Sequence, residues 1–99
     1  MESRTVIEQI VEEHSGFSKE RITLMDFYEV EGCSPGSKLK DVRGKVIPGL
    51  SGEGQIFYVD MAPLANWAHD CVYISVSDIG VQYIQHNWPL CDDFTLRQL

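Results

Sequence analysis

The sequence predicts an α+β domain in which an N-terminal helix packs on a mostly antiparallel, bent sheet of about five strands. Partial closure into a small barrel is the alternative arrangement. Residues 3–16 carry apolar side chains at helical spacing. Most of the remaining chain consists of short apolar, β-branched and aromatic runs separated by Gly and Pro turns. Because 99 residues suit one hydrophobic core, residues 1–99 are expected to form a single domain.

The first element in chain order is the helix over residues 3–16. Its buried face would hold four apolar side chains, Val6, Ile7, Ile10 and Val11. Thr5 and Glu8 have the spacing of a capping box, in which each side chain binds a backbone amide at the helix start. Gly16 suits the left-handed residue after the last turn, with Phe17 folding back onto the helix.

A turn is expected over residues 18–21 and a strand over residues 21–30, because the latter are rich in β-branched and aromatic side chains. Residues 37–47 then hold half of all the basic side chains, namely Lys38, Lys40, Arg43 and Lys45. Two interpretations remain open for this basic segment. It is either an exposed edge strand that lysine keeps soluble, or a strip that binds an anion or an acidic partner.

Three further strands are expected over residues 55–61, 71–77 and 81–86, whereas the tail over residues 92–99 has no clear pattern. In residues 71–77 the apolar positions alternate as in a strand buried on one face. A three-residue loop ending in Gly80 would join the last two strands into a hairpin. If Ser77 pairs with Val81, Cys71 then faces Asn87.

The open end of this hairpin is the predicted binding site. The hairpin would bring two Asn-Trp dipeptides and two histidines together, and the predicted binding residues are Asn66, Trp67, His69, Asp70, His86, Asn87 and Trp88. Exposed Trp side chains are typical of protein-binding hot spots. The alternative is structural, because Trp is usually largely buried and both side chains would then cap the end of the sheet.

A second alternative is a metal- or thiol-dependent enzyme built on His69, Cys71, His86 and Cys91. Nitrogen and sulfur ligands suit zinc, but the usual paired spacings are missing. A catalytic cysteine would need a low thiol pKa, and the acidic residues nearby would raise it. We therefore expect no catalytic residue, metal or cofactor, and the sequence favours a non-enzymatic protein over an enzyme.

Composition limits the classes of partner. The formal net charge is −7, from fifteen acidic and eight basic residues, which argues against nucleic acid or an anionic membrane as partner. The N-terminus lacks a signal-peptide pattern, no apolar run approaches a membrane span, and the three cysteines have no paired spacing, so a cytoplasmic protein with free thiols is expected. The sequence thus favours a small acidic, non-enzymatic binding or regulatory protein, inhibitor- or immunity-like, that docks on a partner protein.

Overall fold

The structure is a computed structural model that describes residues 4–31, 38–50, 54–62, 70–78 and 80–99. Within these residues the elements are α1 (Arg4–Ser15), α2 (Lys19–Thr23), β1 (Asp26–Glu31), β2 (Gln55–Asp60), β3 (Cys71–Ser77), β4 (Gly80–His86) and β5 (Thr95–Gln98). No helix in these ranges has the length and apolar character needed to cross a membrane.

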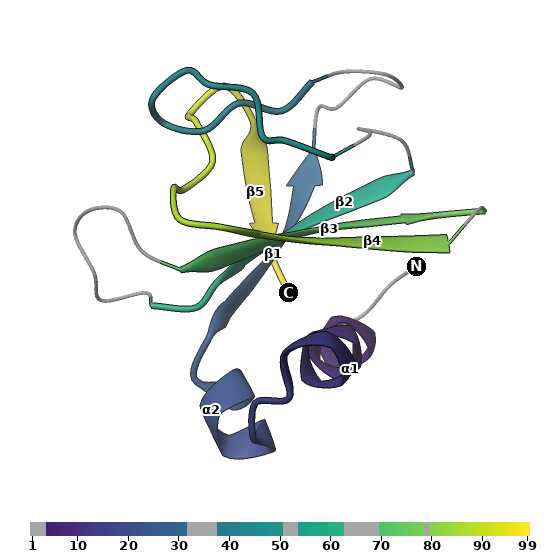
Figure 1. The fold of residues 1–99 in the computed structure, drawn as a ribbon. Helices are drawn as coiled ribbons and strands as arrows, with labels where there is room; N and C mark the ends of the chain where they lie inside the picture. The colour runs from purple at the N-terminus through teal and green to yellow at the C-terminus, as the bar shows by residue number, and fades with distance from the viewer. Residues whose placement is uncertain (1–3, 32–37, 51–53, 63–69, 79) are drawn as a thin grey trace.

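The five strands form one sheet in the order β4-β3-β2-β1-β5, and every neighbouring pair is antiparallel. The sheet is strongly twisted, and its edge strands β4 and β5 do not pair with each other (Figure 1). The predicted α+β fold with a bent antiparallel sheet is therefore confirmed. The sheet is open and does not close into a barrel.

Helix α1 lies against one face of the sheet (Figure 1). Of the four side chains predicted for its buried face, Ile7 and Val11 are fully buried and Ile10 is half-buried. The prediction for Val6 is wrong, because this side chain is 40% exposed. Gly16 adopts φ +75° and its N–H donates to the Glu12 carbonyl at 3.0 Å, which confirms the predicted left-handed end of the helix. The predicted capping box is wrong, because the helix already includes Arg4 and Thr5 therefore cannot be its N-cap. The Glu8 carboxylate instead forms an ion pair with the Arg4 side chain at 3.3 Å.

Two hydrophobic clusters cover the two faces of the sheet. The first lies between α1, α2 and the sheet and includes Phe27, Phe57 and Ile74. The second lies on the opposite face, where residues 38–50 and the segment after β4 pack over the strands (Figure 1). The first five residues of β3 are consequently all buried, so the prediction that this strand is half-buried is wrong. Alternation cannot reveal a second covered face when both faces take apolar side chains.

Two other segments differ from the sequence prediction. Residues 18–21 do not form an isolated turn, because Ser18 caps α2 by accepting a hydrogen bond from the Arg21 N–H at 3.3 Å. The expected strand over residues 21–30 therefore starts only at Asp26. The tail supplies β5, which pairs with β1 as an edge strand although its side chains are all exposed. Backbone hydrogen bonds to β1 hold this segment in place, so its sequence needs no hydrophobic pattern.

The basic segment is not an edge strand of the sheet. It folds over the second face, held by isolated bridges between Lys40 and Val46 and between Asp41 and Leu90. Leu39 and Ile47 point into the second cluster and are about 1% exposed. The lysines between and around them stay exposed because only the alternate positions can reach the core.

The β3–β4 hairpin forms with a register one residue away from the predicted one. Ser77 pairs with Gly80 and Cys71 pairs with His86. The connection is thus two residues long rather than three, and Gly80 belongs to β4 with φ +130°. The tight connection moves His86 onto the last pair of the hairpin and leaves Asn87 beyond it.

Candidate functional site

The structure brings part of the predicted site together at the open end of the β3–β4 hairpin. Asp70 directly precedes β3, whereas Asn87 and Trp88 directly follow β4. With its amide nitrogen turned towards the two oxygens, Asn87 donates to the His86 carbonyl and to the Asp70 carboxylate, both at 3.3 Å. The predictions for Asn66, Trp67 and His69 fall outside the described residues.

Asp41 lies at the centre of this region and was missed by the sequence interpretation. It is 0% exposed. One carboxylate oxygen accepts from the Arg43 guanidinium at 2.8 Å and from His86 Nε2 at 3.0 Å. The other oxygen accepts from the backbone N–H groups of Arg43 at 2.9 Å and Lys45 at 3.4 Å. A buried carboxylate is tolerated here because donors surround it.

These donors determine the charge state of Asp41. Burial by itself would raise the pKa of the carboxyl group. Hydrogen bonds from Arg43, from His86 and from the two backbone amides outweigh burial and hold the pKa well below its usual range. Asp41 is therefore an anion throughout the physiological range, fully engaged by its donors and unsuited to act as a general base.

Arg43 links this buried anion to the surface. While one guanidinium nitrogen binds Asp41, the guanidinium carbon lies 4.5 Å from the centre of a Trp88 ring. The Arg43 side chain remains one-third exposed, and Trp88 is half-buried. The result is an Arg–Trp stack at the surface whose cation is fixed from below by a buried carboxylate.

Local sequence explains why Asp41 adopts this position. Asp41 and Gly44 have the spacing of the first and last residues of a type I turn, with Asp preferred first and Gly last. The Gly44 N–H donates to the Asp41 carbonyl at 2.8 Å, and Gly44 adopts φ +80°. This Asp-x-x-Gly spacing was the signal in the sequence that predicts a side chain folded back onto its own turn.

Backbone hydrogen bonds join this turn to the segment after β4. The Val42 N–H donates to the Pro89 carbonyl at 2.9 Å, and the Cys91 N–H donates to the Lys40 carbonyl at 3.0 Å. The turn is therefore docked beside Trp88 by main-chain contacts as well as by Arg43. We use the name Arg–Trp surface for Arg43 and Trp88 together with Asp70 and Asn87.

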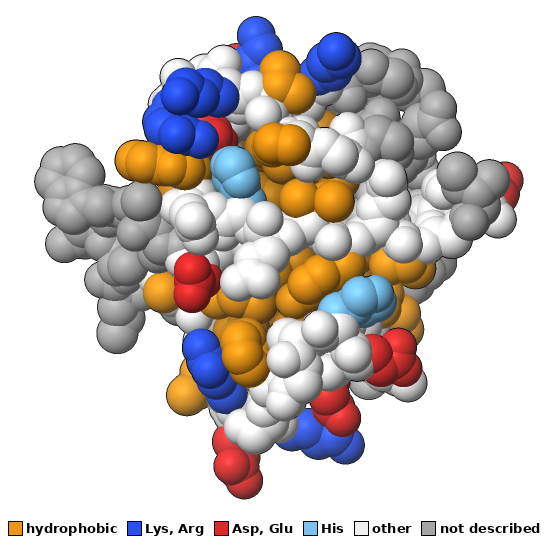
Figure 2. All heavy atoms as spheres, in the orientation of Figure 1, with side chains coloured by type: hydrophobic (Ala, Val, Ile, Leu, Met, Phe, Trp, Pro, Cys, Tyr) orange, Lys and Arg blue, Asp and Glu red, His pale blue; other side chains and the backbone are white. Residues whose placement is uncertain are grey.

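Half of the basic side chains of the chain lie on the same side, in residues 38–45. In Figure 2, a group of Lys and Arg side chains lies at the top, over residues 38–50, and other basic side chains lie among the Asp and Glu side chains towards the helices. Lys40 and Lys45 flank the turn and are exposed, as are the apolar side chains of Val42 and Val46. The Arg–Trp surface is thus bordered by positive charge on a protein that is acidic overall.

Cys71 has a structural role. Its thiol donates to the Trp88 carbonyl at 3.2 Å and lies 3.5 Å from the His86 carbonyl. Burial raises the pKa of the thiol to about 12, with the negative charges of Asp60 and Asp70 adding to the effect. A thiol held protonated and bonded to carbonyl oxygens is a poor nucleophile, so this geometry argues against catalysis by Cys71.

An aromatic row crosses the second face of the sheet beneath the basic segment. It runs from Tyr28 through Tyr58 and Tyr73 to His86, with ring centres 5.2–6.1 Å apart. The Tyr73 hydroxyl donates to the Trp88 carbonyl at 2.9 Å. The Tyr58 hydroxyl is buried and has no hydrogen-bond partner among the described residues. The row supports His86 and Trp88 from inside.

The metal alternative gains no support from the described residues. Within residues 4–31, 38–50, 54–62, 70–78 and 80–99, no three His, Cys, Asp or Glu side chains are grouped as metal ligands. His86 uses Nε2 to bind Asp41, and Cys91 is half-buried. His69, the other histidine of that alternative, lies outside the described residues.

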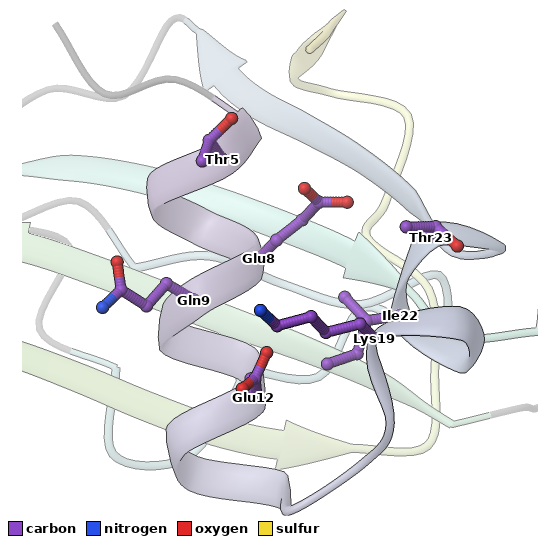
Figure 3. Close-up of a pocket in the computed structure, with 7 residues that line it drawn as sticks. All are labelled: Thr5, Glu8, Gln9, Glu12, Lys19, Ile22 and Thr23. Atoms are coloured by element: carbon purple, nitrogen blue, oxygen red, sulfur yellow. The ribbon is translucent and has the colours of Figure 1, made fainter.

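A separate hollow of about 320 Å³ lies between α1 and α2 (Figure 3). Its lining residues are Thr5, Glu8, Gln9, Glu12, Lys19, Ile22 and Thr23. Figure 3 shows Lys19 extending into the space beside Glu8 and Glu12. The hollow is open, and Glu8 is already bound by Arg4, so it offers no converging set of groups for a ligand.

Comparisons with known proteins add no relative, because no protein-family model, no curated protein and no solved structure matches the chain.

Proposed function

We propose that this chain is a small acidic, non-enzymatic binding protein that docks on a partner protein through the Arg–Trp surface. The observation that carries the proposal is the buried Asp41, which fixes Arg43 against Trp88 at the edge of the molecule. Trp and Arg are among the residues that are enriched in binding hot spots. An inhibitor- or immunity-like role fits a short chain whose described residues offer no complete catalytic group.

Preorganisation is the physical reason to favour docking at this position. A free arginine side chain loses rotamer freedom when a partner binds it, and this loss weakens the association. Here Asp41 and Trp88 already hold Arg43 in one orientation. Much of the ordering cost is therefore met during folding, and the exposed part of the guanidinium is available for a partner.

The border of the surface suggests the partner's chemistry. Lys40 and Lys45 are exposed beside the turn, and Val42 and Val46 are 51% and 45% exposed. A partner with carboxylates around an apolar or aromatic centre would be complementary to this arrangement. Because the rest of the chain is acidic, the local positive charge would also orient such a partner towards this side.

The test is affinity capture from native lysate followed by titration of the captured protein against purified variants. Trp88→Ala and Arg43→Ala should each weaken binding by at least about thirtyfold, since hot-spot truncations cost roughly 2 kcal/mol or more. Leu24→Ala is the matched control, because Leu24 is 78% exposed and lies beside α2, away from the basic segment. Equal affinity of all three variants for the captured partner would overturn the proposal.

A further inference from the structure

The two edges of the sheet differ in how they are protected against pairing with another strand. Edge strand β5 has four residues, and its Arg97 forms ion pairs with Glu29 and Glu31 of β1. Edge strand β4 has seven residues, GVQYIQH, with neither proline nor an Asp, Glu, Lys or Arg side chain. Charge and proline are the usual means of blocking an exposed edge, so β4 lacks the common protection.

The register determines which backbone groups of β4 point outwards. A two-residue connection makes Ser77 and Gly80 a hydrogen-bonded pair, and hydrogen-bonded and non-hydrogen-bonded pairs then alternate along the hairpin. The N–H and C=O groups of Val81, Tyr83 and Gln85 are therefore directed away from β3. In the described part of the chain, no backbone hydrogen bond joins β4 to any segment other than β3.

We propose that β4 pairs antiparallel with β4 of a second copy of this chain, around a two-fold axis at Tyr83. In this register Tyr83 faces its own copy, and Val81 faces Gln85 of the other chain in both directions. Each of these pairs exchanges both backbone hydrogen bonds. No other antiparallel register of β4 with itself pairs all three outward-directed residues, so the edge is self-complementary.

The side chains on this edge also fit a second copy. Val81 is 44% exposed, and it would pack against the alkyl part of Gln85 across the pair. The Tyr83 ring is half-buried and stacked on His14 of α1, with ring centres 4.6 Å apart. In the proposed register it would lie beside the Tyr83 ring of the second copy as a cross-strand aromatic pair.

Charge is the main obstacle to self-association of a chain with net charge −7. Along the strip where β4 runs in Figure 1, Figure 2 shows mainly backbone and uncharged side chains, with a group of basic side chains above it and helices bearing both acidic and basic side chains below it. The side chains that this contact pairs across β4 are therefore uncharged, while the basic side chains of both copies lie on the same side of the contact. The two-fold axis is perpendicular to the sheet and keeps both Arg–Trp surfaces on one face, so the proposed dimer would present that surface twice.

The test measures the dissociation constant of the dimer by sedimentation equilibrium for the full chain and three variants. Val81→Lys combined with Gln85→Lys places two like-charged pairs across the axis and should weaken association about thirtyfold. Val81→Lys combined with Gln85→Glu places opposite charges at the same positions and should restore it. Leu96→Lys, on the exposed face of β5, is the control and should leave the dissociation constant unchanged.

A chain that stays monomeric at all accessible concentrations overturns the inference, and so does a dimer that both charge variants leave intact. Amide hydrogen exchange of the unmodified chain tests the β4–β4 pairing without relying on how the variants fold. The amides of Val81, Tyr83 and Gln85 should exchange more slowly as protein concentration rises. Exchange rates of these amides that do not change with protein concentration refute pairing between two copies. Slower exchange that appears only when a different protein supplies the strand refutes it as well.

Discussion

Replacing Asp41 by Asn tests the central contact of the Arg–Trp surface. The wild-type carboxylate accepts four hydrogen bonds, two on each oxygen. An Asn side chain has one oxygen, so its NH₂ group must face either the Arg43 and His86 donors or the backbone amides. Two bonds to an ionised group are lost, and at the low end of about 1.5 kcal/mol each this amounts to about 3 kcal/mol of unfolding free energy.

The loss of unfolding free energy in Asp41→Asn should become smaller as pH falls. The pKa of Asp41 in the folded chain is lowered, whereas the unfolded side chain titrates near its ordinary value of about 3.9. The stabilisation from Asp41 is therefore complete above roughly pH 5 and declines as pH falls, because only the unfolded state takes up the proton there. The stability difference between wild type and Asp41→Asn should narrow as pH falls from about 5 towards 2.

Urea unfolding followed by circular dichroism at a series of pH values measures this difference. Asp92→Asn is the matched control, since it removes one negative charge from an exposed side chain in the neighbouring segment. The control should change stability by less than about 0.5 kcal/mol. A difference for Asp41→Asn that is equally small, or that stays constant down to about pH 2, would refute the account of the buried anion.

Two further predictions concern the aromatic row and a close backbone approach. Tyr58→Phe should leave the unfolding free energy unchanged or raise it by about 1 kcal/mol, because the buried Tyr58 hydroxyl has no hydrogen-bond partner among the described residues. Tyr73→Phe should lower the unfolding free energy by about 1 kcal/mol, because it removes the hydrogen bond to the Trp88 carbonyl. Thermal unfolding of the two variants measures this contrast, and equal effects would contradict it. Gly54→Ala should cost at least about 2 kcal/mol, because Gly54 has φ +73° and a Cβ there would lie 2.2 Å from the Val76 carbonyl oxygen. Gly44→Ala is its control, since Gly44 has a similar φ of +80° but open space around it. Equal losses of stability would show that the contact with Val76 adds nothing.

The order of local elements was predictable where a single pattern dominates. Helix α1 followed from apolar side chains at helical spacing, and its end followed from Gly16. Strands β2, β3 and β4 followed from short apolar runs between turn residues. In each case the physical cause lies within a few residues of the chain, so the sequence contains it.

The candidate site was predictable only in part. The hairpin pattern alone was enough to bring Asp70 near Asn87, even though the register differs by one residue. Asp41 was not identified, because its role depends on His86, which is 45 residues away in the sequence. The Asp-x-x-Gly turn signal indicated local backbone contacts, but it could not indicate that the carboxylate would be buried.

The sequence by itself determined an α+β chain with one amphipathic helix, short strands and a hairpin whose open end collects polar and aromatic residues. Only the tertiary structure decided that residues 38–50 cover the second face of the sheet and that the tail becomes β5. The reason is that covering a face and adding an edge strand depend on surfaces formed by distant segments. Those surfaces exist only once the sheet has assembled, and they convert Asp41 from a turn residue into the buried support of Arg43 and Trp88.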